Sequence, residues 1–186
     1  MSQTVLSPPR VAVLGPESCG KTTLVEALAA RCLQHGVAAV AVPEYAREYY
    51  RERAYRPEYA DVVAIARGQL AAEDGACIGA EVLICDTTVS TCKIWSDVAF
   101  GRCGADLLAL HRPDSYALTL LTSPDIPWQP DPLRSHPHER ESLWQRYCDE
   151  LARARVVPVH VRGTHEERVA TAWRAMRQCL PGLPII

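Results

Sequence analysis

The chain has 186 residues, 48% of them hydrophobic, which is enough for one domain with a substantial core and short for two. Its 20 Lys and Arg nearly balance its 22 Asp and Glu, so the formal net charge is −2. Binding to a polyanion usually requires a basic face. We therefore expect a single domain over residues 1–186 that binds a small molecule and no nucleic acid, while the composition leaves the oligomeric state open.

The N-terminal segment and the cysteines indicate a cytoplasmic protein. Residues 1–9 are polar and contain two prolines, without the basic start and apolar run of a signal peptide, so we expect a flexible terminus. No segment approaches the roughly 18 to 20 apolar residues that span a bilayer, which predicts no membrane partner. The eight cysteines include no C-x-x-C pair. Such cysteines mostly pack as small hydrophobes in a reducing compartment, so we expect no structural zinc.

Short apolar runs alternate with helical patterns along the chain. The expected strands cover residues 11–14, 37–42, 81–85, 116–121 and 156–161, and the expected helices cover 21–34, 57–76, 88–100, 137–155 and 165–179. Strands that alternate with helices form parallel sheets, and nearly continuous apolar strands are typical of sheets covered on both faces. The predicted fold is therefore a three-layer α/β sandwich with a five-stranded parallel sheet flanked by helices.

The first expected strand is followed by a Walker A pattern, Gly15-Pro16-Glu17-Ser18-Cys19-Gly20-Lys21-Thr22. A strand before the pattern and a helix after it are the context of a P-loop NTPase, in which backbone amides cradle phosphate oxygens. Lys21 should contact the β- and γ-phosphates and Thr22 should coordinate Mg²⁺, so we expect ATP and Mg²⁺ as cofactors. The candidate ATP-binding residues are Gly15, Glu17, Ser18, Cys19, Gly20, Lys21, Thr22, Thr23, Arg134 and Arg140.

The second expected strand is followed by an acidic residue, Glu44. Ligands of such sheets bind beyond the carboxyl ends of the strands, so Glu44 should face the P-loop and accept the proton of an attacking hydroxyl. The alternative is a charge in the first turn of a helix. Tyr45 and Arg47 are further candidates for substrate contacts, although Arg47 could instead be a surface charge paired with Glu44 or Asp61.

The third expected strand is followed directly by Asp86, in the position of a Walker B carboxylate. We expect Asp86 to bind the metal together with Thr22, to contact the substrate, and to serve as the alternative catalytic base. Its other possible role is to cap the following helix. Trp95, within that helix, is either a core residue or an aromatic face for a cationic ring of the substrate.

The regular pattern fails over residues 122–140, where five prolines interrupt any element. Long irregular loops in compact domains are usually linkers or functional lids. Trp128, Arg134 and Arg140 favour a lid, in which the guanidinium groups bind phosphate and Arg134 acts in catalysis. The alternative for each arginine is a solvated position on the surface. Trp128, like Trp95, is either a core residue or a substrate contact.

Six motifs together resemble the ribosylnicotinamide kinase domain of NadR-type proteins over residues 9–180. They are Gly-Pro-Glu-Ser-Cys-Gly-Lys-Thr-Thr at 15–23, Glu-Tyr-Ala-Arg-Glu at 44–48, Ala-Arg-Gly-Gln at 66–69, Cys-Asp-Thr-Thr at 85–88, Lys-Ile-Trp-Ser-Asp-Val at 93–98, and Ser-Pro-Asp-Ile-Pro-Trp with Asp-Pro-Leu-Arg within 123–134. The resemblance implies a nucleoside or nucleotide kinase fold with a lid. It also implies ATP-dependent phosphorylation of the ribose 5′-hydroxyl of nicotinamide riboside, giving nicotinamide mononucleotide for NAD biosynthesis.

The chain departs from this family in three ways. Cys19 and Thr22 stand where serines are common, and Pro130-Asp131-Pro132 replaces a more acidic turn that contains glycine. The helix-turn-helix and adenylyltransferase portions of full-length members are absent, so transcriptional repression and adenylylation are not expected. Two alternatives stay open, namely a kinase for another nucleoside or nucleotide and an ATP-binding regulatory switch module. An N-K-x-D signature of guanine specificity is absent, which weakens the switch alternative.

Overall fold

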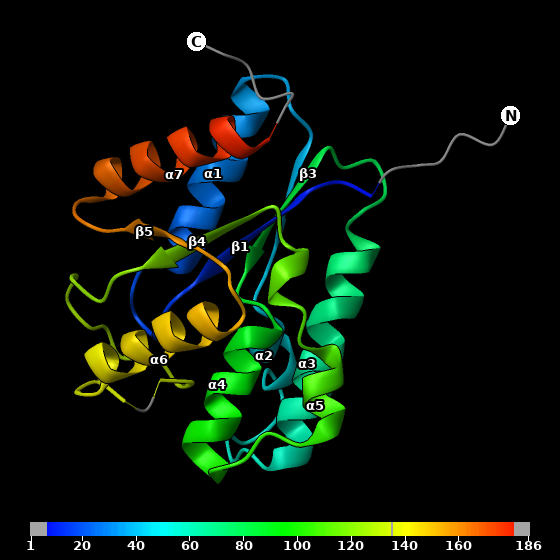
Figure 1. Ribbon diagram of the computed structural model, residues 1–186, viewed down its shortest axis with the longest axis vertical. Coiled ribbons are helices and arrows are strands. Elements are labelled where there is room, and N and C mark those ends of the chain that lie inside the picture. The colour runs from blue at the N-terminus through cyan, green and yellow to red at the C-terminus, as the bar shows by residue number, and fades with distance from the viewer. Residues whose placement is uncertain (1–6, 135, 181–186) are drawn as a thin grey trace, which may run out of the picture.

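The computed structural model describes residues 7–134 and 136–180 and contains one five-stranded sheet between layers of helices (Figure 1). Residues 1–6 of the expected flexible terminus and residue 135 of the expected lid lie outside the described residues. The strands are β1 (Arg10–Leu14), β2 (Ala39–Val42), β3 (Val82–Asp86), β4 (Leu118–Thr122) and β5 (Val159–Val161). The α-helices are α1 (Lys21–Gln34), α2 (Tyr45–Tyr49), α3 (Tyr59–Gly75), α4 (Val89–Phe100), α5 (Ala105–Leu110), α6 (Arg140–Arg153) and α7 (His165–Cys179).

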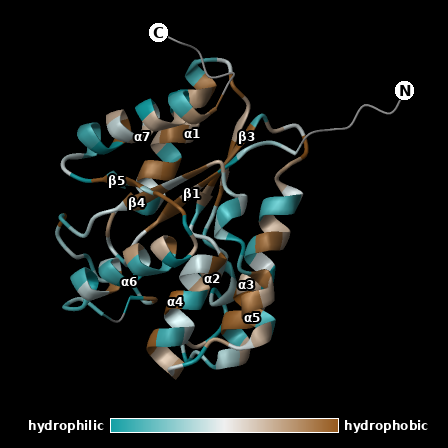
Figure 2. Cartoon of the chain, viewed as in Figure 1, coloured by the Kyte–Doolittle hydropathy of each residue, from teal (hydrophilic) through white to brown (hydrophobic). Residues whose placement is uncertain are grey.

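All pairings in the sheet are parallel, in the order β2-β3-β1-β4-β5. The predicted five-stranded parallel sheet flanked by helices is therefore confirmed. The three central strands, β1, β3 and β4, are mainly apolar and almost fully buried because both faces of the sheet are covered, as the brown strands at the centre of Figure 2 show. Val11 and Val13 pack with α1 and α7 on one face, and Ala12 and Leu14 pack with α4 and α6 on the other.

The structure contains all five strands and all five helices that the sequence predicts, with the expected bounds for α1 and α7. It adds α2, α5 and a 3₁₀ helix at Pro113–Ser115, which the sequence did not indicate. Helices of five or six residues complete less than two turns, so they show no 3.6-residue repeat of apolar residues. Among the described residues, no helix is long and apolar enough to cross a membrane.

The sheet order decides where the functional loops meet. After β1 the chain runs toward the β2 edge of the sheet, and after β3 it runs in the opposite direction, toward β4. Because β1 and β3 are neighbours, the loops after them diverge at the carboxyl edge of the sheet and open a crevice there. The P-loop follows β1 and Asp86 ends β3, so this topology brings the two phosphate-binding signals together.

Candidate active site

The P-loop lies in a tight turn that only glycine permits at its first position. Gly15 has φ 143°, and a Cβ there would lie 2.7 Å from the carbonyl oxygen of Thr122. The Thr122 hydroxyl donates to Leu14 O at 3.0 Å and lies 2.8 Å from Cys19 Sγ. Thr122, at the end of β4, therefore stabilises the P-loop, and no motif in the sequence pointed to this residue.

A second support comes from α7. Arg168 is 4% exposed, and its guanidinium donates to the backbone oxygens of Cys19 at 2.8 Å and Ser123 at 3.1 Å. It also pairs with Asp125. Sequence reasoning missed Arg168 because it lies more than 140 residues from the P-loop and belongs to no motif.

Lys21 is bent back over the loop it follows. Its Nζ donates to Gly15 O at 3.0 Å and to Pro16 O at 2.7 Å. Burial acts to lower the pKa of Lys21, but neighbouring groups including Glu44 and Asp86 outweigh it and raise the pKa above its usual value. Lys21 is therefore a permanent cation at the mouth of the loop, where a phosphate group would take the place of the backbone carbonyls.

Thr22 and Asp86 lie together, as the metal-site prediction requires. The Thr22 hydroxyl donates to Asp86 Oδ2 at 2.5 Å, and Asp86 is 2% exposed. Its Oδ1 is buried without a hydrogen-bond partner among the described residues. Buried carboxylate oxygens rarely stay unpaired, and a carboxylate with a hydroxyl is an oxygen donor set that suits Mg²⁺. The residues present therefore fit a magnesium ion.

The alternative role of Asp86 as a helix cap does not occur. The N-cap of α4 is Thr88, whose hydroxyl accepts a hydrogen bond from Ser90 N at 3.2 Å. Between Asp86 and Thr88, Thr87 has φ 68°, a left-handed conformation that is unusual for a β-branched residue. Thr87 lines the pocket, and strained backbone of this kind tends to occur at functional sites.

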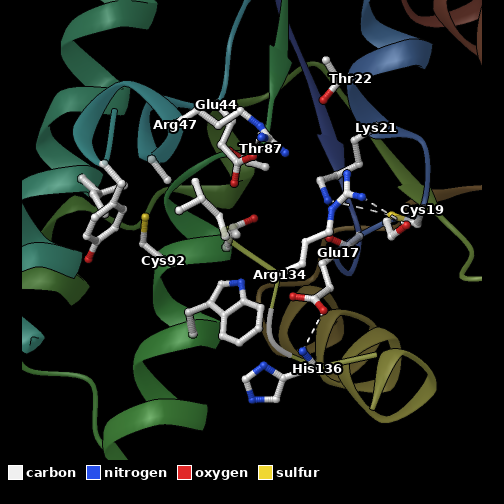
Figure 3. A pocket seen from close by; sticks show the side chains of 18 of the residues that line it. Glu17, Cys19, Lys21, Thr22, Glu44, Arg47, Thr87, Cys92, Arg134 and His136 are labelled. Atoms are coloured by element: carbon white, nitrogen blue, oxygen red, sulfur yellow. Dashed lines mark hydrogen bonds and ion pairs between the residues drawn. The ribbon is translucent and has the colours of Figure 1, made fainter. Parts of the chain in front are cut away.

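Glu44 stands at the N-cap position of α2 but makes no side-chain capping bond. Its carboxylate instead lines the pocket, opposite the P-loop in Figure 3. Burial raises its pKa, with a smaller contribution from Asp86, while Lys21 and Arg47 oppose the shift. Arg47 lies 3.4 Å from the Glu44 carboxylate and 3.0 Å from that of Asp131. Arg47 therefore links Glu44 to the segment between β4 and α6.

Lys21, Thr22 and Glu44 line one cavity of about 270 Å³ (Figure 3). Asp86 is not part of its wall and is connected to it through the hydrogen bond from Thr22. The phosphate end of the cavity is formed by the P-loop together with Glu44, Arg47 and Arg134. The rest of the wall is mostly apolar and aromatic, with contributions from α2, α3, α4 and the segment before α6. This part comprises Ala46, Tyr50, Tyr55, Pro57, Val62, Ile65, Gln69, Thr87, Thr91, Cys92, Trp95, Ala99, Phe100, Leu133, His136 and, from α6, Tyr147. A polar end joined to an apolar chamber can hold a molecule with a phosphate-accepting group and a flat ring.

The two tryptophans have different positions. Trp95 lines the cavity, and its ring lies 5.0 Å from that of His136. Trp128 is absent from the cavity wall, and its indole N–H donates to Glu17 Oε1 at 3.2 Å. Tyr45 is also outside the wall, because its ring packs over Gly68 of α3.

The arginines of the segment between β4 and α6 both contact the P-loop. Arg134 Nη1 donates to Gln129 O at 2.7 Å and lies 3.4 Å from the Ser18 hydroxyl. Arg140 Nη1 donates to Ser18 O at 3.1 Å and to Ile126 O at 2.9 Å. Arg134 lines the cavity and Arg140 does not. Arg140 thus fixes the segment to the P-loop, whereas Arg134 is placed to contact a ligand.

Comparisons with known proteins agree with this fold. A family model described as an AAA domain matches residues 10–168. The crystal structure of a NadR protein in complex with NR is similar, with a TM-score of 0.74 and 21% identity, covering 97% of this chain and 52% of that chain. The crystal structure of a NadR protein in complex with NAD and AMP-PNP is similar with a TM-score of 0.68 and 22% identity. The match covers 97% of this chain and 51% of that chain. Thymidylate kinase from Ehrlichia chaffeensis is similar with a TM-score of 0.60 and 12% identity. The match covers 92% of this chain and 97% of the thymidylate kinase chain.

No curated protein matches the sequence. The chain spans about half the length of the two NadR chains. At these identities the likeness shows the fold, so the predicted resemblance to the NadR kinase domain is confirmed as a P-loop kinase-like fold. Because the family model covers most of the sequence, this chain is a member of the AAA domain family of P-loop proteins.

Proposed function

We propose that the chain is an ATP-dependent kinase that phosphorylates the ribose 5′-hydroxyl of nicotinamide riboside and yields nicotinamide mononucleotide. One observation carries the proposal. A carboxylate, Glu44, lines the same cavity as the P-loop, and that cavity continues into an aromatic chamber beside Trp95. Phosphoryl transfer to an alcohol needs these three parts, namely a phosphate cradle, an acceptor for the hydroxyl proton and a pocket for the rest of the acceptor. The NadR structures with NR and with AMP-PNP support the choice of acceptor and nucleotide.

The residues divide the reaction between them. Lys21 and Arg134 would bind the phosphate oxygens of ATP and stabilise the charge that develops during transfer. Glu44 would orient the 5′-hydroxyl and accept its proton. Mg²⁺, held by Thr22 and Asp86, would supply charge neutralisation at the phosphates. The elevated pKa of Glu44 suits a proton acceptor, because its conjugate acid is closer to the working pH than that of an ordinary carboxyl.

The segment 122–140 would act as a lid. Arg134, Leu133 and His136 already line the cavity, while Arg140 ties the start of α6 to the P-loop. Closing an active site excludes water, which would otherwise compete with the acceptor hydroxyl for the phosphoryl group. A site that excludes water transfers the phosphoryl group to the acceptor, as a kinase does, whereas a site open to water hydrolyses ATP.

A kinase for another nucleoside or nucleotide is the second candidate, because thymidylate kinase shares the fold over almost its whole length. Acceptor choice is therefore the point to test. ADP release would be measured with MgATP and a panel that contains nicotinamide riboside, uridine, cytidine, thymidine and thymidylate, with mass spectrometry of the products. We expect nicotinamide riboside to give the highest kcat/KM and a product heavier by one phosphoryl group.

Preferential turnover of a pyrimidine acceptor would replace the proposed substrate and keep the kinase. Binding of ATP without turnover of any acceptor would favour a regulatory switch module. The Glu44→Gln variant is the matched control, because it preserves the shape of the side chain and removes the proton acceptor. Its kcat should fall by about 10²-fold, within the usual range for general-base catalysis.

A further inference from the structure

A buried chain of hydrogen bonds runs beneath α2 and ends next to Glu44. Gln69 of α3 is 2% exposed and accepts a hydrogen bond from the backbone N–H of Tyr45 at 3.0 Å. Its amide nitrogen lies 3.4 Å from Glu73 Oε1. Glu73 is fully buried and accepts from Tyr116 Oη at 2.9 and 3.0 Å and from Arg10 at 3.1 Å. The chain therefore reaches from the start of β1 to the peptide that follows Glu44.

The direction of each hydrogen bond in this chain is fixed by chemistry. A backbone N–H can only donate, so Gln69 must present its oxygen to Tyr45. The Gln69 amide then directs its NH₂ group to Glu73, which must accept. Arg10 can only donate, so Glu73 is surrounded by donors and holds Gln69 in one of its two amide orientations.

Gln69 also fixes the backbone of the residue that follows Glu44. An N-cap side chain can accept a hydrogen bond from the backbone N–H of the second or third residue of its helix, and Tyr45 is the first residue of α2. Glu44 makes no such bond, and the amide of Tyr45 is satisfied from α3. The preceding residue of α3, Gly68, receives the ring of Tyr45. Two successive residues of α3 thus hold both the amide and the ring of the residue next to Glu44.

We propose that Gln69 is a positioning residue for phosphoryl transfer, and that buried Glu73 fixes its orientation so that the Glu44 carboxylate faces the acceptor. This inference rests on the proposed role of Glu44 as the proton acceptor. It adds a specific dependence, namely that Gln69 affects catalysis through Glu44 and has little effect on ATP binding. Gln69 lines the cavity, but the polar group it holds is the backbone of α2.

A double-mutant cycle between Gln69 and Glu44 tests this dependence. We expect Gln69→Leu to lower kcat about tenfold and to change KM for ATP by less than about twofold, because the phosphate cradle is untouched. In the Glu44→Gln background, the same change should lower kcat by less than about twofold. Residues that act as one unit show such non-additive losses, whereas independent effects multiply. Losses that multiply in the double variant would overturn the proposal.

An exchange of the side chains of Gln69 and Glu73 provides a second test, in which both positions stay polar. In Gln69→Glu, the new carboxylate faces that of Glu73, so kcat should fall about tenfold. Adding Glu73→Gln restores one acid and one amide in the pair, and kcat should recover to within about threefold of the wild type. Failure to recover in a variant that is folded by circular dichroism would contradict the orienting role of Glu73.

The control is Tyr59→Phe on the same helix. It removes the hydrogen bonds that Tyr59 makes with Asp106 at 2.6 Å and Gly104 N at 2.9 Å, away from the cavity wall. Its kcat should stay within about twofold of the wild type, which separates positioning from a general loosening of α3. All variants would be assayed with the best acceptor of the wild type and for ATP hydrolysis without acceptor. Failure of nicotinamide riboside as a substrate would then count against the proposed function alone, because the cycle on ATP hydrolysis still tests Gln69.

Discussion

Two carboxylates at the site have different surroundings, and the difference suggests their roles: Glu44 lines the cavity, whereas Asp86 lies behind Thr22. Asp86 accepts a hydrogen bond from Thr22 and keeps one buried oxygen unpaired, which suits a metal ligand. Glu44 makes no capping bond and lies between Lys21, Arg47 and Asp86 at the wall of the cavity. When the surroundings of two carboxylates differ in burial and hydrogen bonding, one can act as a metal ligand and the other as a proton acceptor.

The first prediction concerns the pH dependence of kcat/KM. A base must be deprotonated, so the acidic limb of the profile should lie above the usual carboxyl range, since burial raises the pKa of Glu44. Arg47 favours the charged form of Glu44, so Arg47→Gln should raise this pKa further and move the limb to higher pH. Glu44→Gln should remove the limb. A limb that persists unchanged in Glu44→Gln would assign the proton acceptor to another group.

The second prediction separates the two tryptophans. Nicotinamide riboside carries a cationic ring, and a cation over an aromatic face contributes about 0.5 to 2 kcal/mol. Because Trp95 lines the cavity, Trp95→Leu should raise KM for nicotinamide riboside by about 2- to 30-fold, at tenfold per 1.4 kcal/mol. KM for ATP should stay nearly constant.

Two comparisons control this experiment. Trp128→Leu should change KM for nicotinamide riboside less than Trp95→Leu, because Trp128 bonds Glu17 outside the cavity wall. In the Trp95→Leu variant, KM should rise less for a neutral acceptor such as uridine than for the cationic nicotinamide riboside. Equal losses for both acceptors would indicate that the ring of Trp95 only fills space.

At the scale of elements, the contact between α2 and α3 decides the shape of the acceptor side. A Cβ at Gly68 would overlap the ring of Tyr45, whereas a Cβ at Gly75 of the same helix would meet nothing within 4 Å. Gly68 lies inside α3, where alanine is more favourable than glycine by about 1 kcal/mol, and Gly75 is the last residue of this helix. The steric environment therefore determines which of the two substitutions is tolerated.

The third prediction follows from this pair of glycines. Gly75→Ala should leave kcat unchanged and hold or raise Tm. Gly68→Ala should displace α2, lower Tm and reduce kcat by at least about tenfold, because α2 follows directly after Glu44. Thermal unfolding and steady-state assays of the two variants would check this. Equal behaviour of the two alanine variants would mean that α2 moves without consequence for the site.

At the scale of the whole molecule, the phosphate site lies where both halves of the sheet meet, so ligand binding should stabilise the entire fold. MgATP at 100 times its Kd would add about 2.7 kcal/mol, which corresponds to roughly 5 to 10 °C in Tm for a chain of this size. We propose that the described chain unfolds as one domain, because one sheet carries the cores of both faces. A single shifted transition in calorimetry is the expected result.

The fourth prediction uses two lysines to assign this stabilisation. Lys21→Ala should lose most of the shift caused by MgATP. Lys93→Ala removes hydrogen bonds to Asp97 at 3.0 Å and Glu150 at 2.8 Å, so it should lower the Tm of the free protein. Because Lys93 lies outside the cavity wall, that variant should keep the full shift. A normal shift in Lys21→Ala would contradict the role of the P-loop lysine.

The amino-acid sequence alone predicts the succession of strands and long helices along the chain, the P-loop and its proximity to Asp86. These features depend on local signals, namely apolar runs, glycines at fixed spacing and an acid at the end of a strand, and parallel topology brings the strand ends to one edge. Only the tertiary structure decided that Trp95 lines the cavity while Trp128 bonds Glu17, and that Arg168 and Thr122 support the P-loop. The contacts of Trp128, Arg168 and Thr122 join residues more than 100 positions apart, and their geometry depends on how helices pack across the sheet, which no local pattern records.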